Sequence, residues 1–311
     1  MGAPVLLTEG PDAGLVSHLD NPNLEQRRID SSWVGLGNRD ILSVSGPDRL
    51  VWLHSLTTQF LEGLEPGRAI TALVLSPTGH VEHLLRGVDD GKTFWAWTDA
   101  GRGPALVGWL DSMRFMMRVE VLAHPELRLV WTGRDVPPPD GVVSMDSEVA
   151  GGHELLLPDD AGDPRAPQAG VRAWEASRIE AGVPRIGLDT DERTIPNEIG
   201  LYGTHLDKGC YRGQETVARV HTMGRPPRRL TRLTLDGSGT ELPEPGAEIT
   251  LEGRRVGVLG SVAVHHEDGP IALCLLRRST DPEATLDVAG VTAGQEILVD
   301  PQVGLHVRPI L

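Results

Sequence analysis

The C-terminal part of this chain constrains the fold most, because it carries strand patterns and no helical periodicity. Gly253 and Asp268-Gly269 mark turns between short apolar segments, and short strands at this spacing are typical of a small barrel or sandwich. The pattern begins after a Gly-Arg-Pro-Pro stretch at residues 224–227, which places a domain boundary there. Six strands are expected, at Leu230–Leu235, Glu248–Glu252, Arg255–Val264, Ile271–Leu276, Ala284–Val288 and Gln295–Val299.

The preceding part of the chain mixes helix and strand patterns. Apolar residues recur at helical spacing from Leu50 to Leu64, after a Ser45-Gly46-Pro47-Asp48 start in which Ser45 could act as the N-cap. A strand, a Ser76–Gly79 turn and a returning strand follow. Another helix is expected from Val171 to Ala181, with Gly182 as its C-terminal cap. The sequence therefore predicts both helices and strands before residue 224.

Bulk properties limit the functions that the chain can have. It has 311 residues, which is long for one core, and a net charge of −15, which disfavours direct binding of nucleic acid. The N-terminus lacks the pattern of a signal peptide, and no apolar run approaches the ~18 residues that span a bilayer. The two cysteines do not suggest a disulfide framework. We therefore expect a cytoplasmic protein without membrane contact, and nothing in the sequence points beyond a monomer.

The most informative motif is Lys208-Gly209-Cys210-Tyr211-Arg212-Gly213-Gln214-Glu215. Cations favour the reactive thiolate, and here they lie two residues before and two residues after Cys210. Glycines permit tight turns and close approach of a ligand. Cys274, in contrast, lies in an apolar run and is assigned to the core. We therefore expect Cys210, with Lys208 holding its thiolate, to be the chemically active pair.

A run of arginines stands out against the acidic composition. Five of them, and no acidic residue, lie between Arg219 and Arg232. Clustered positive charge on an acidic protein indicates a site for an anionic ligand, while a solvated linker between domains is an equally good interpretation.

The cysteine motif, continued through Thr216-Val217-Ala218-Arg219, resembles the signature of the YgfZ family of folate-binding proteins. This family is related in fold to the T-protein of the glycine cleavage system, an aminomethyltransferase. A second segment, Trp174–Pro184, resembles the Arg-Leu/Ile-Glu-Ala-Gly-x-Pro helix of the T-protein relatives. The resemblance implies an α+β, T-protein-like folate-binding core of two interleaved α/β halves over residues 1–225. A C-terminal β-barrel over residues 226–311 would complete the fold.

The resemblance also implies a cofactor site for tetrahydrofolate. In the relatives the glutamate of the second segment contacts the pterin, which makes Glu180 the pterin-binding candidate here; a carboxylate suits the paired donors of a pterin. The other cofactor-binding candidates are Arg178, Tyr211, Gln214 and Arg225. The T-protein carries an aspartate pair where this chain has Glu82-His83. Because a displacement of about an ångström can cost a hundredfold in rate, glycine-cleavage activity is not expected.

Three functions remain after these arguments. The first is a folate-binding accessory protein for the assembly or repair of iron–sulfur clusters, with transient client or scaffold partners that include tRNA-modifying enzymes. The second is a folate-dependent aminomethyltransferase or one-carbon transferase, with Glu82, His83 and Glu180 as candidate acids and bases. The third, ranked last, is a redox sensor based on Cys210, because no resolving cysteine lies near it. No metal site is expected, since the histidines do not converge in sequence.

Overall fold

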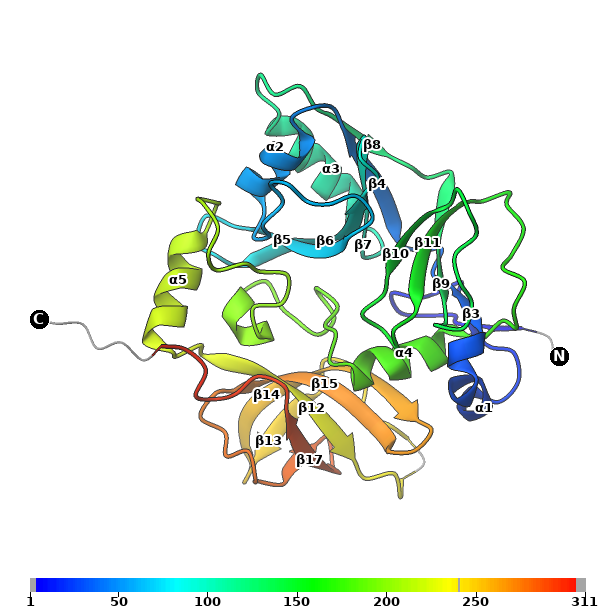
Figure 1. Cartoon of the computed structure of the whole chain (residues 1–311). Helices are drawn as coiled ribbons and strands as arrows, with labels where there is room; N and C mark the ends of the chain where they lie inside the picture. The colour runs from blue at the N-terminus through cyan, green and yellow to red at the C-terminus, as the bar shows by residue number, and fades with distance from the viewer. Residues whose placement is uncertain (1–3, 240, 306–311) are drawn as a thin grey trace, which may run out of the picture.

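Three lobes built on β-sheets surround a common centre (Figure 1). The structure is a computed structural model that describes residues 4–239 and 241–305. Residues 1–3, which form part of the N-terminal segment considered above, lie outside this description. Among the described residues, no helix is both long enough and apolar enough to cross a membrane.

The first lobe is a five-stranded antiparallel sheet with two helices. Its strands are ordered β5-β6-β7-β4-β8, and apolar residues of the sheet pack against both helices. The elements are β4 (Asp40–Ser45), α2 (Arg49–Leu56), β5 (Ala69–Leu75), β6 (Val81–Asp89), β7 (Thr93–Thr98), α3 (Gly103–Ser112) and β8 (Glu120–Ala123).

The second lobe is a four-stranded sheet ordered β10-β11-β9-β3. Strand β3 precedes the first lobe in the chain but pairs with β9 of the second, so the two halves interleave. Helix α4 packs on this sheet through residues such as Trp174. The elements are β1 (Val5–Leu6), β2 (Val16–His18), α1 (Pro22–Arg27), η1 (Ile29–Ser31), β3 (Trp33–Gly35), β9 (Leu127–Thr132), β10 (Val143–Asp146), β11 (His153–Pro158) and α4 (Val171–Glu180).

The third lobe is a closed barrel ordered β12-β15-β14-β13-β16-β17, which confirms the six expected strands. Alternate residues of β15 face in opposite directions. Ala272, Cys274 and Leu276 fill the barrel interior, while Ile271 and Leu273 pack outward against the first lobe. The elements are η2 (Pro196–Ile199), α5 (Gln214–Met223), β12 (Arg228–Leu235), β13 (Glu248–Leu251), β14 (Arg254–His265), β15 (Gly269–Arg277), β16 (Leu286–Val288) and β17 (Val291–Ile297).

Two sequence expectations about helices need correction. Helix α2 begins at Arg49 and ends at Leu56, and Ser45 is the last residue of β4 and not a helix cap. The apolar spacing continued beyond the helix because residues such as Leu61 pack in the same core from the following loop. Helix α5 was not expected, since its sequence is mostly polar and only Val217 is buried. Helix α4 begins at Val171 as predicted, and Gly182 follows it with a φ of +69°.

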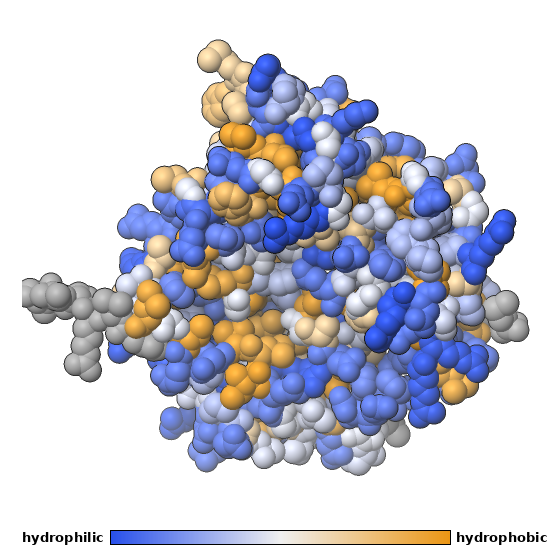
Figure 2. All heavy atoms as spheres, viewed as in Figure 1, coloured by the Kyte–Doolittle hydropathy of each residue, from blue (hydrophilic) through white to orange (hydrophobic). Residues whose placement is uncertain are grey.

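The face seen in Figure 2 interleaves hydrophobic and hydrophilic residues. The elements that meet at the centre of Figure 1 are α4, the segment that follows it, and the outer wall of the barrel. The candidate site residues come from these elements and from the loop before α5.

Candidate functional site

Cys210 lies exposed on the loop between η2 and α5. The prediction of an exposed thiol is therefore confirmed, as is the assignment of Cys274 to the core. Burial raises the pKa of the Cys274 thiol far above its usual value, and this thiol donates to the carbonyl oxygen of Thr231 at 3.5 Å. One cysteine is thus presented to solvent, and the other is enclosed in the barrel.

Lys208 clamps the loop to the end of α2, and its predicted role beside the Cys210 thiolate stays a prediction. Its Nζ donates to the carbonyl oxygens of His54, Thr57 and Gln59, at 2.5 Å to Thr57 and 3.0 Å to Gln59. The last carbonyl groups of a helix lack partners within the helix, so this ammonium completes the end of α2. Burial lowers the pKa of Lys208 to about 8.

The choice of lysine at this position is informative, because Lys208 and Lys92 are the only lysines in the chain. A lysine ammonium is compact and carries three donors, whereas the guanidinium of arginine is a wide planar fork. Three carbonyl oxygens converging on one point match the ammonium. The Lys208 Nζ also lies 4.9 Å from the centre of the Tyr211 ring, which adds a cation–π contact.

The rest of the motif ties the loop to its surroundings on the other side of Cys210. The Tyr211 N–H donates to the Gln214 side chain at 3.1 Å, and Arg212 lies 3.4 Å from Glu82 of β6. Gly213 has a φ of +79°, and a Cβ added there would lie 2.5 Å from the carbonyl oxygen of Ser76. Only glycine fits this position. The loop that presents Cys210 is therefore held to the first lobe at both ends.

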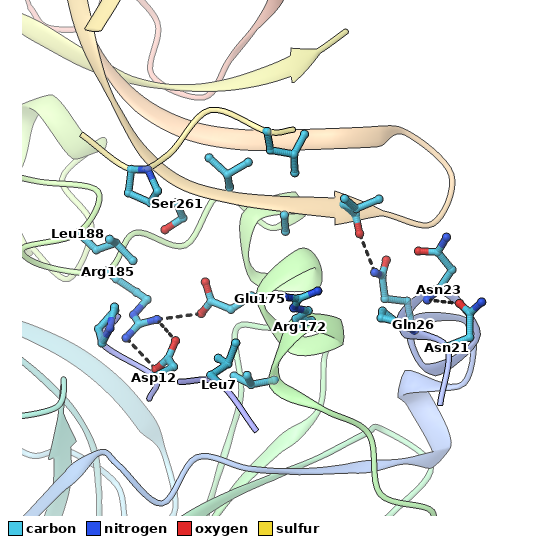
Figure 3. A pocket seen from close by; sticks show the side chains of 18 residues that line it. Leu7, Asp12, Asn21, Asn23, Gln26, Arg172, Glu175, Arg185, Leu188 and Ser261 are labelled. Carbon is cyan, nitrogen blue, oxygen red and sulfur yellow. Dashed lines mark hydrogen bonds and ion pairs between the residues drawn. The ribbon is translucent and has the colours of Figure 1, made fainter. Parts of the chain in front are cut away.

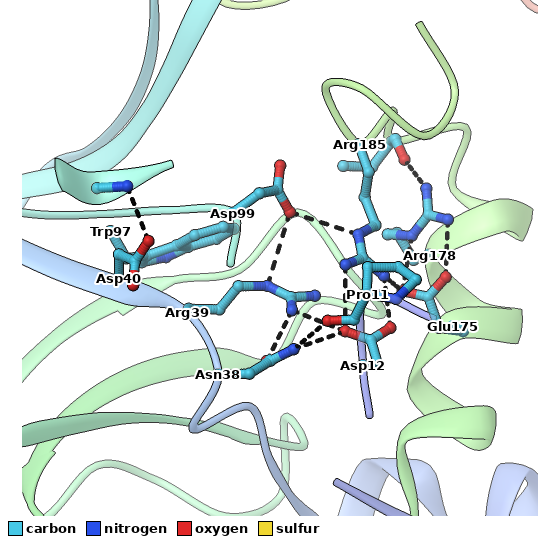
Figure 4. A network of polar contacts seen from close by, with 12 residues as sticks. Pro11, Asp12, Asn38, Arg39, Asp40, Trp97, Asp99, Glu175, Arg178 and Arg185 are labelled. Atoms are coloured by element: carbon cyan, nitrogen blue, oxygen red, sulfur yellow. Dashed lines mark hydrogen bonds and ion pairs between the residues drawn. The ribbon is translucent and has the colours of Figure 1, made fainter. Parts of the chain in front are cut away.

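A buried cluster of charges joins the lobes at the centre (Figure 4). The Arg185 guanidinium donates to Asp12 at 2.6 and 3.1 Å and to Glu175 at 3.2 Å, and its Nε lies 3.4 Å from Asp99. We call this set the interlobe charge cluster; it comprises Asp12, Arg39, Asp99, Glu175, Arg178, Arg185 and Asp189.

The cluster also reaches the barrel. Arg178, which is almost fully buried, donates to Asp189 at 3.0 Å and to the Ser261 hydroxyl of β14. Asp189 accepts the Ser261 N–H at 2.7 Å, where β14 bulges. A Cβ at Gly260 would lie 2.5 Å from the Asp189 carboxylate, so glycine is required for this approach. Although burial opposes its charge, the pKa of Asp12 is held well below its usual value by Arg185 and Arg39.

Beside this cluster lies a cavity of about 630 Å³ between α1, α4 and the barrel strand β14 (Figure 3). Its volume is in the range of small-molecule sites. The wall is largely apolar, and three of its four charged residues, Glu175, Asp12 and Arg185, meet on one side. Arg172 of α4 is exposed at the edge of the cavity.

Glu175 is a carboxylate of the cavity that can still accept a hydrogen bond. A carboxylate has about four acceptor positions. Asp12 accepts four bonds, three on Oδ1 and one on Oδ2, with Asn38, Arg39 and Arg185 as donors. Glu175 uses three, two with Arg178 and one with Arg185, which leaves a position on Oε2.

Glu180, the predicted pterin ligand, lies at the other end of α4. Its side chain is 51% exposed and lies 3.6 Å from His265 of β14, and Glu180 is not among the residues that line the cavity. Its role stays a prediction. The sequence analysis missed Glu175, although its spacing of three residues from Arg178 was a signal for an ion pair on one helix face.

The remaining predicted residues do not gather at the cavity. Arg178 lines a much smaller central cavity of about 30 Å³, Tyr211 and Gln214 stabilise the cysteine loop, and Arg225 is exposed just after α5. The arginine run does not form one site, because its members bind separately: Arg228 contacts Asp191, whereas Arg229 is enclosed in the barrel. Their binding roles otherwise stay predictions.

Glu82 and His83 lie next to each other on β6 but face opposite ways. Glu82 shares its face with Leu84 and Arg86, which line the small central cavity. Burial and the nearby Arg102 lower the pKa of His83 to about 4, so its ring is neutral at pH 7. In the described part of the chain, no group of three or more His, Cys, Asp or Glu side chains could hold a metal ion.

The fold defines the class of protein. A solved structure, that of the glycine cleavage system aminomethyltransferase T from Bartonella henselae, matches 95% of this chain and 94% of its own with a TM-score of 0.80 at 17% identity. The family model of the CAF17 C-terminal β-barrel domain matches residues 228–299. The chain thus has a T-protein-like fold that ends in a CAF17-type barrel.

Sequence relatives narrow this class. The tRNA-modifying protein YgfZ of Escherichia coli (strain UMN026) is 33% identical over 145 residues, and the alignment covers 44% of this chain and 40% of that protein. A chloroplastic protein of Arabidopsis thaliana, named as a candidate transferase, is 27% identical over 290 residues, covering 80% and 66%. The chain therefore spans less than two thirds of these relatives' lengths. Together, these findings confirm the predicted relationship to the YgfZ family.

Proposed function

We propose that this chain binds tetrahydrofolate and serves as an accessory protein for iron–sulfur clusters of client enzymes, among them enzymes that modify tRNA. The observation that carries the folate part is the 630 Å³ cavity with Glu175 beside it. A reduced pterin offers an N–H and an exocyclic amine, and the open position on Glu175 Oε2 can accept a charge-assisted hydrogen bond from one of these donors. The apolar wall suits the aromatic part of the ligand, and Arg172 suits its carboxylate tail.

The residues of the cavity therefore fit the cofactor. Glu175 would receive the pterin, and the interlobe charge cluster would fix the orientation of its carboxylate, because Arg178 and Arg185 both bind it. A bound tetrahydrofolate would supply nitrogen atoms that carry one-carbon groups. Glu180, which the family resemblance indicates as the pterin ligand, lies on the same helix and is the natural competitor for this role.

The folate part is tested by anaerobic calorimetric titration with tetrahydrofolate. We expect saturable binding by the wild-type protein, at least ~10-fold weaker binding by Glu175→Gln, and no change beyond ~3-fold in Glu180→Gln, since one charge-assisted hydrogen bond contributes 1.5–3 kcal/mol or so. The two variants are matched in helix and in chemistry. The opposite ranking would move the pterin to Glu180, and a wild-type protein that shows no binding at millimolar ligand would refute the proposal.

The iron–sulfur part rests on the exposed thiol. Protein-bound clusters generally need four cysteine ligands, and this chain has two, one of them inside the barrel. A cluster would therefore be the cargo of a partner, to which Cys210 lends a transient thiolate. We expect Cys210→Ala to fail in restoring an iron–sulfur tRNA-thiolating enzyme in deficient cells, while Cys274→Ala restores it. Full restoration by Cys210→Ala would remove the thiol from the mechanism.

One-carbon transfer is the second candidate, and the position of Glu82 favours it. This carboxylate lines a cavity of about 670 Å³ and lies 3.4 Å from Arg212 of the loop that presents Cys210. The reaction would convert tetrahydrofolate to its methylene form with an aminomethyl donor, and Glu82→Gln should then lower the rate by ~100-fold or more. Absence of turnover by a protein that binds folate would exclude this function for the donors tested.

A further inference from the structure

Another cavity, of about 470 Å³, lies between the outer wall of the barrel and the Leu188–Arg193 segment. Four arginines line it: Arg193 from this segment, Arg228 from β12, Arg255 from β14 and Arg277 from β15. The two acidic residues of its wall are Asp189 and Asp191. A concentration of positive charge is unexpected on a protein with a net charge of −15.

The arginines differ in how far their charge is already neutralised. Arg228 is engaged by Asp191 at 2.5 and 2.9 Å and by Glu198 at 2.8 and 2.9 Å. Arg255 lies 3.0 Å from Glu248, and both side chains of this pair are more than half exposed. Within the described residues, no acidic partner lies within ion-pair distance of Arg193 or Arg277. These two cations therefore remain free to bind an anion.

The strand register adds an independent argument. Arg228 and Arg277 are direct Cα partners on the neighbouring antiparallel strands β12 and β15. Residues directly opposite each other point to the same face, and like charges in such a pair are destabilising. Arg277 shares its face of β15 with Leu275, which also lines the cavity. Because Asp191 and Glu198 already neutralise Arg228, Arg277 is the guanidinium of this pair that is left to bind an anion.

We propose that this cavity binds the phosphate group of a small phosphorylated molecule, with Arg193 and Arg277 as its main ligands. Arginine recognises phosphate with paired donors, and the volume allows a ligand of small-metabolite size. The acidic surface disfavours a long nucleic-acid backbone, although its phosphate would offer the same chemistry. The site is distinct from the proposed folate cavity, because the two sets of lining residues share Leu188 alone.

The test is a calorimetric titration of the full chain with inorganic pyrophosphate, adenosine 5′-phosphate and a 12-nucleotide single-stranded RNA at low salt. We expect the two small ligands to bind with a Kd below ~1 mM, and the double variant Arg193→Gln/Arg277→Gln to weaken binding at least ~10-fold. Arg165→Gln/Arg254→Gln removes the same charge from exposed positions that do not line the cavity, and should leave binding unchanged.

Three outcomes would overturn the proposal. The first is a wild-type protein without saturable binding of pyrophosphate or adenosine 5′-phosphate. The second is equal weakening in both double variants, which would reduce the effect to net charge. The third is binding of RNA alone, which would assign the cavity to a nucleic-acid backbone. Titration of the Arg193→Gln/Arg277→Gln variant with tetrahydrofolate separates this proposal from the folate proposal, because its folate affinity should equal that of the wild-type protein.

Discussion

The interlobe charge cluster and the loop that presents Cys210 are both held by charged side chains, yet they are built in different ways. The cluster is mostly buried, and its acids and bases bind one another. The loop is fixed at both ends, by Lys208 and Arg212, and its thiol forms no hydrogen bond with the residues that the structure describes. Buried charges that bind each other hold elements in place, whereas a fixed loop with a free group is suited to meet a partner.

Loss of Arg185 should lower the free energy of unfolding more than any change in the Cys210 loop. Arg185→Met leaves Asp12 and Glu175 buried with fewer compensating charges, and breaking a buried pair from one side costs about 3–5 kcal/mol. The free energy of unfolding from urea titration measures this loss. Arg165→Met, at an exposed position, is the control and should change stability by less than ~0.5 kcal/mol. A loss below ~1 kcal/mol in Arg185→Met would show that the cluster does not hold the lobes together.

The second largest effect is expected from low pH, which should reduce the stability that the cluster contributes through Asp12. The pKa of Asp12 lies below its unfolded value, so the unfolded chain binds more protons at low pH and stability falls as the pH drops below about 5. Asp12→Asn removes this contribution, which is on the order of 2 kcal/mol. The gap in unfolding free energy between wild type and Asp12→Asn should therefore shrink from pH 7 to pH 3. A gap that stays constant would mean that Asp12 is not preferentially charged in the folded state.

The loop should respond to the loss of its clamp with a smaller change in stability. Lys208→Met leaves the carbonyl oxygens at the end of α2 without their donor, and we expect a loss of about 1–2 kcal/mol. The freed loop should also change the alkylation rate of Cys210 severalfold. Lys92→Met, at the other and exposed lysine, is the control and should change neither the stability nor the alkylation rate of Cys210. If Lys208→Met alters neither quantity, the clamp has no role in presenting the thiol.

The smallest effect is expected at the thiol itself. Cys210→Ser should change the unfolding free energy by less than ~0.5 kcal/mol, since the side chain is exposed. Mass spectrometry after brief iodoacetamide treatment should find native wild-type protein labelled at Cys210, with Cys274 labelled only after unfolding. Labelling of Cys274 in the folded protein would contradict the closed barrel interior.

The sequence allowed the prediction of local features better than of contacts between distant segments. The barrel strands and the exposed state of Cys210 follow from short-range patterns and were confirmed. The clamp made by Lys208 could not be predicted in this way, because proximity in sequence to Cys210 suggested only an electrostatic partner. The fold brings Lys208 to carbonyl groups about 150 residues earlier in the chain.

The interlobe charge cluster was beyond sequence reasoning for the same reason. Asp12 and Arg185 are 173 positions apart, and no periodic pattern marks either residue. Glu175 was passed over in favour of Glu180 because the family motif directed attention to the end of the helix. The structure shows that the two glutamates, five positions apart on α4, face different surroundings.

The bond between Arg178 and Ser261 has a consequence for how this protein can be taken apart. The barrel matches a family model of its own, which invites its exchange between relatives as a cassette. However, Ser261 at its β14 bulge accepts a hydrogen bond from Arg178 and donates one to Asp189, and both of these residues belong to the core. A transplanted barrel without this serine and its neighbouring glycine would leave Arg178 and Asp189 without these contacts. The barrel and the core must therefore be inherited and engineered together.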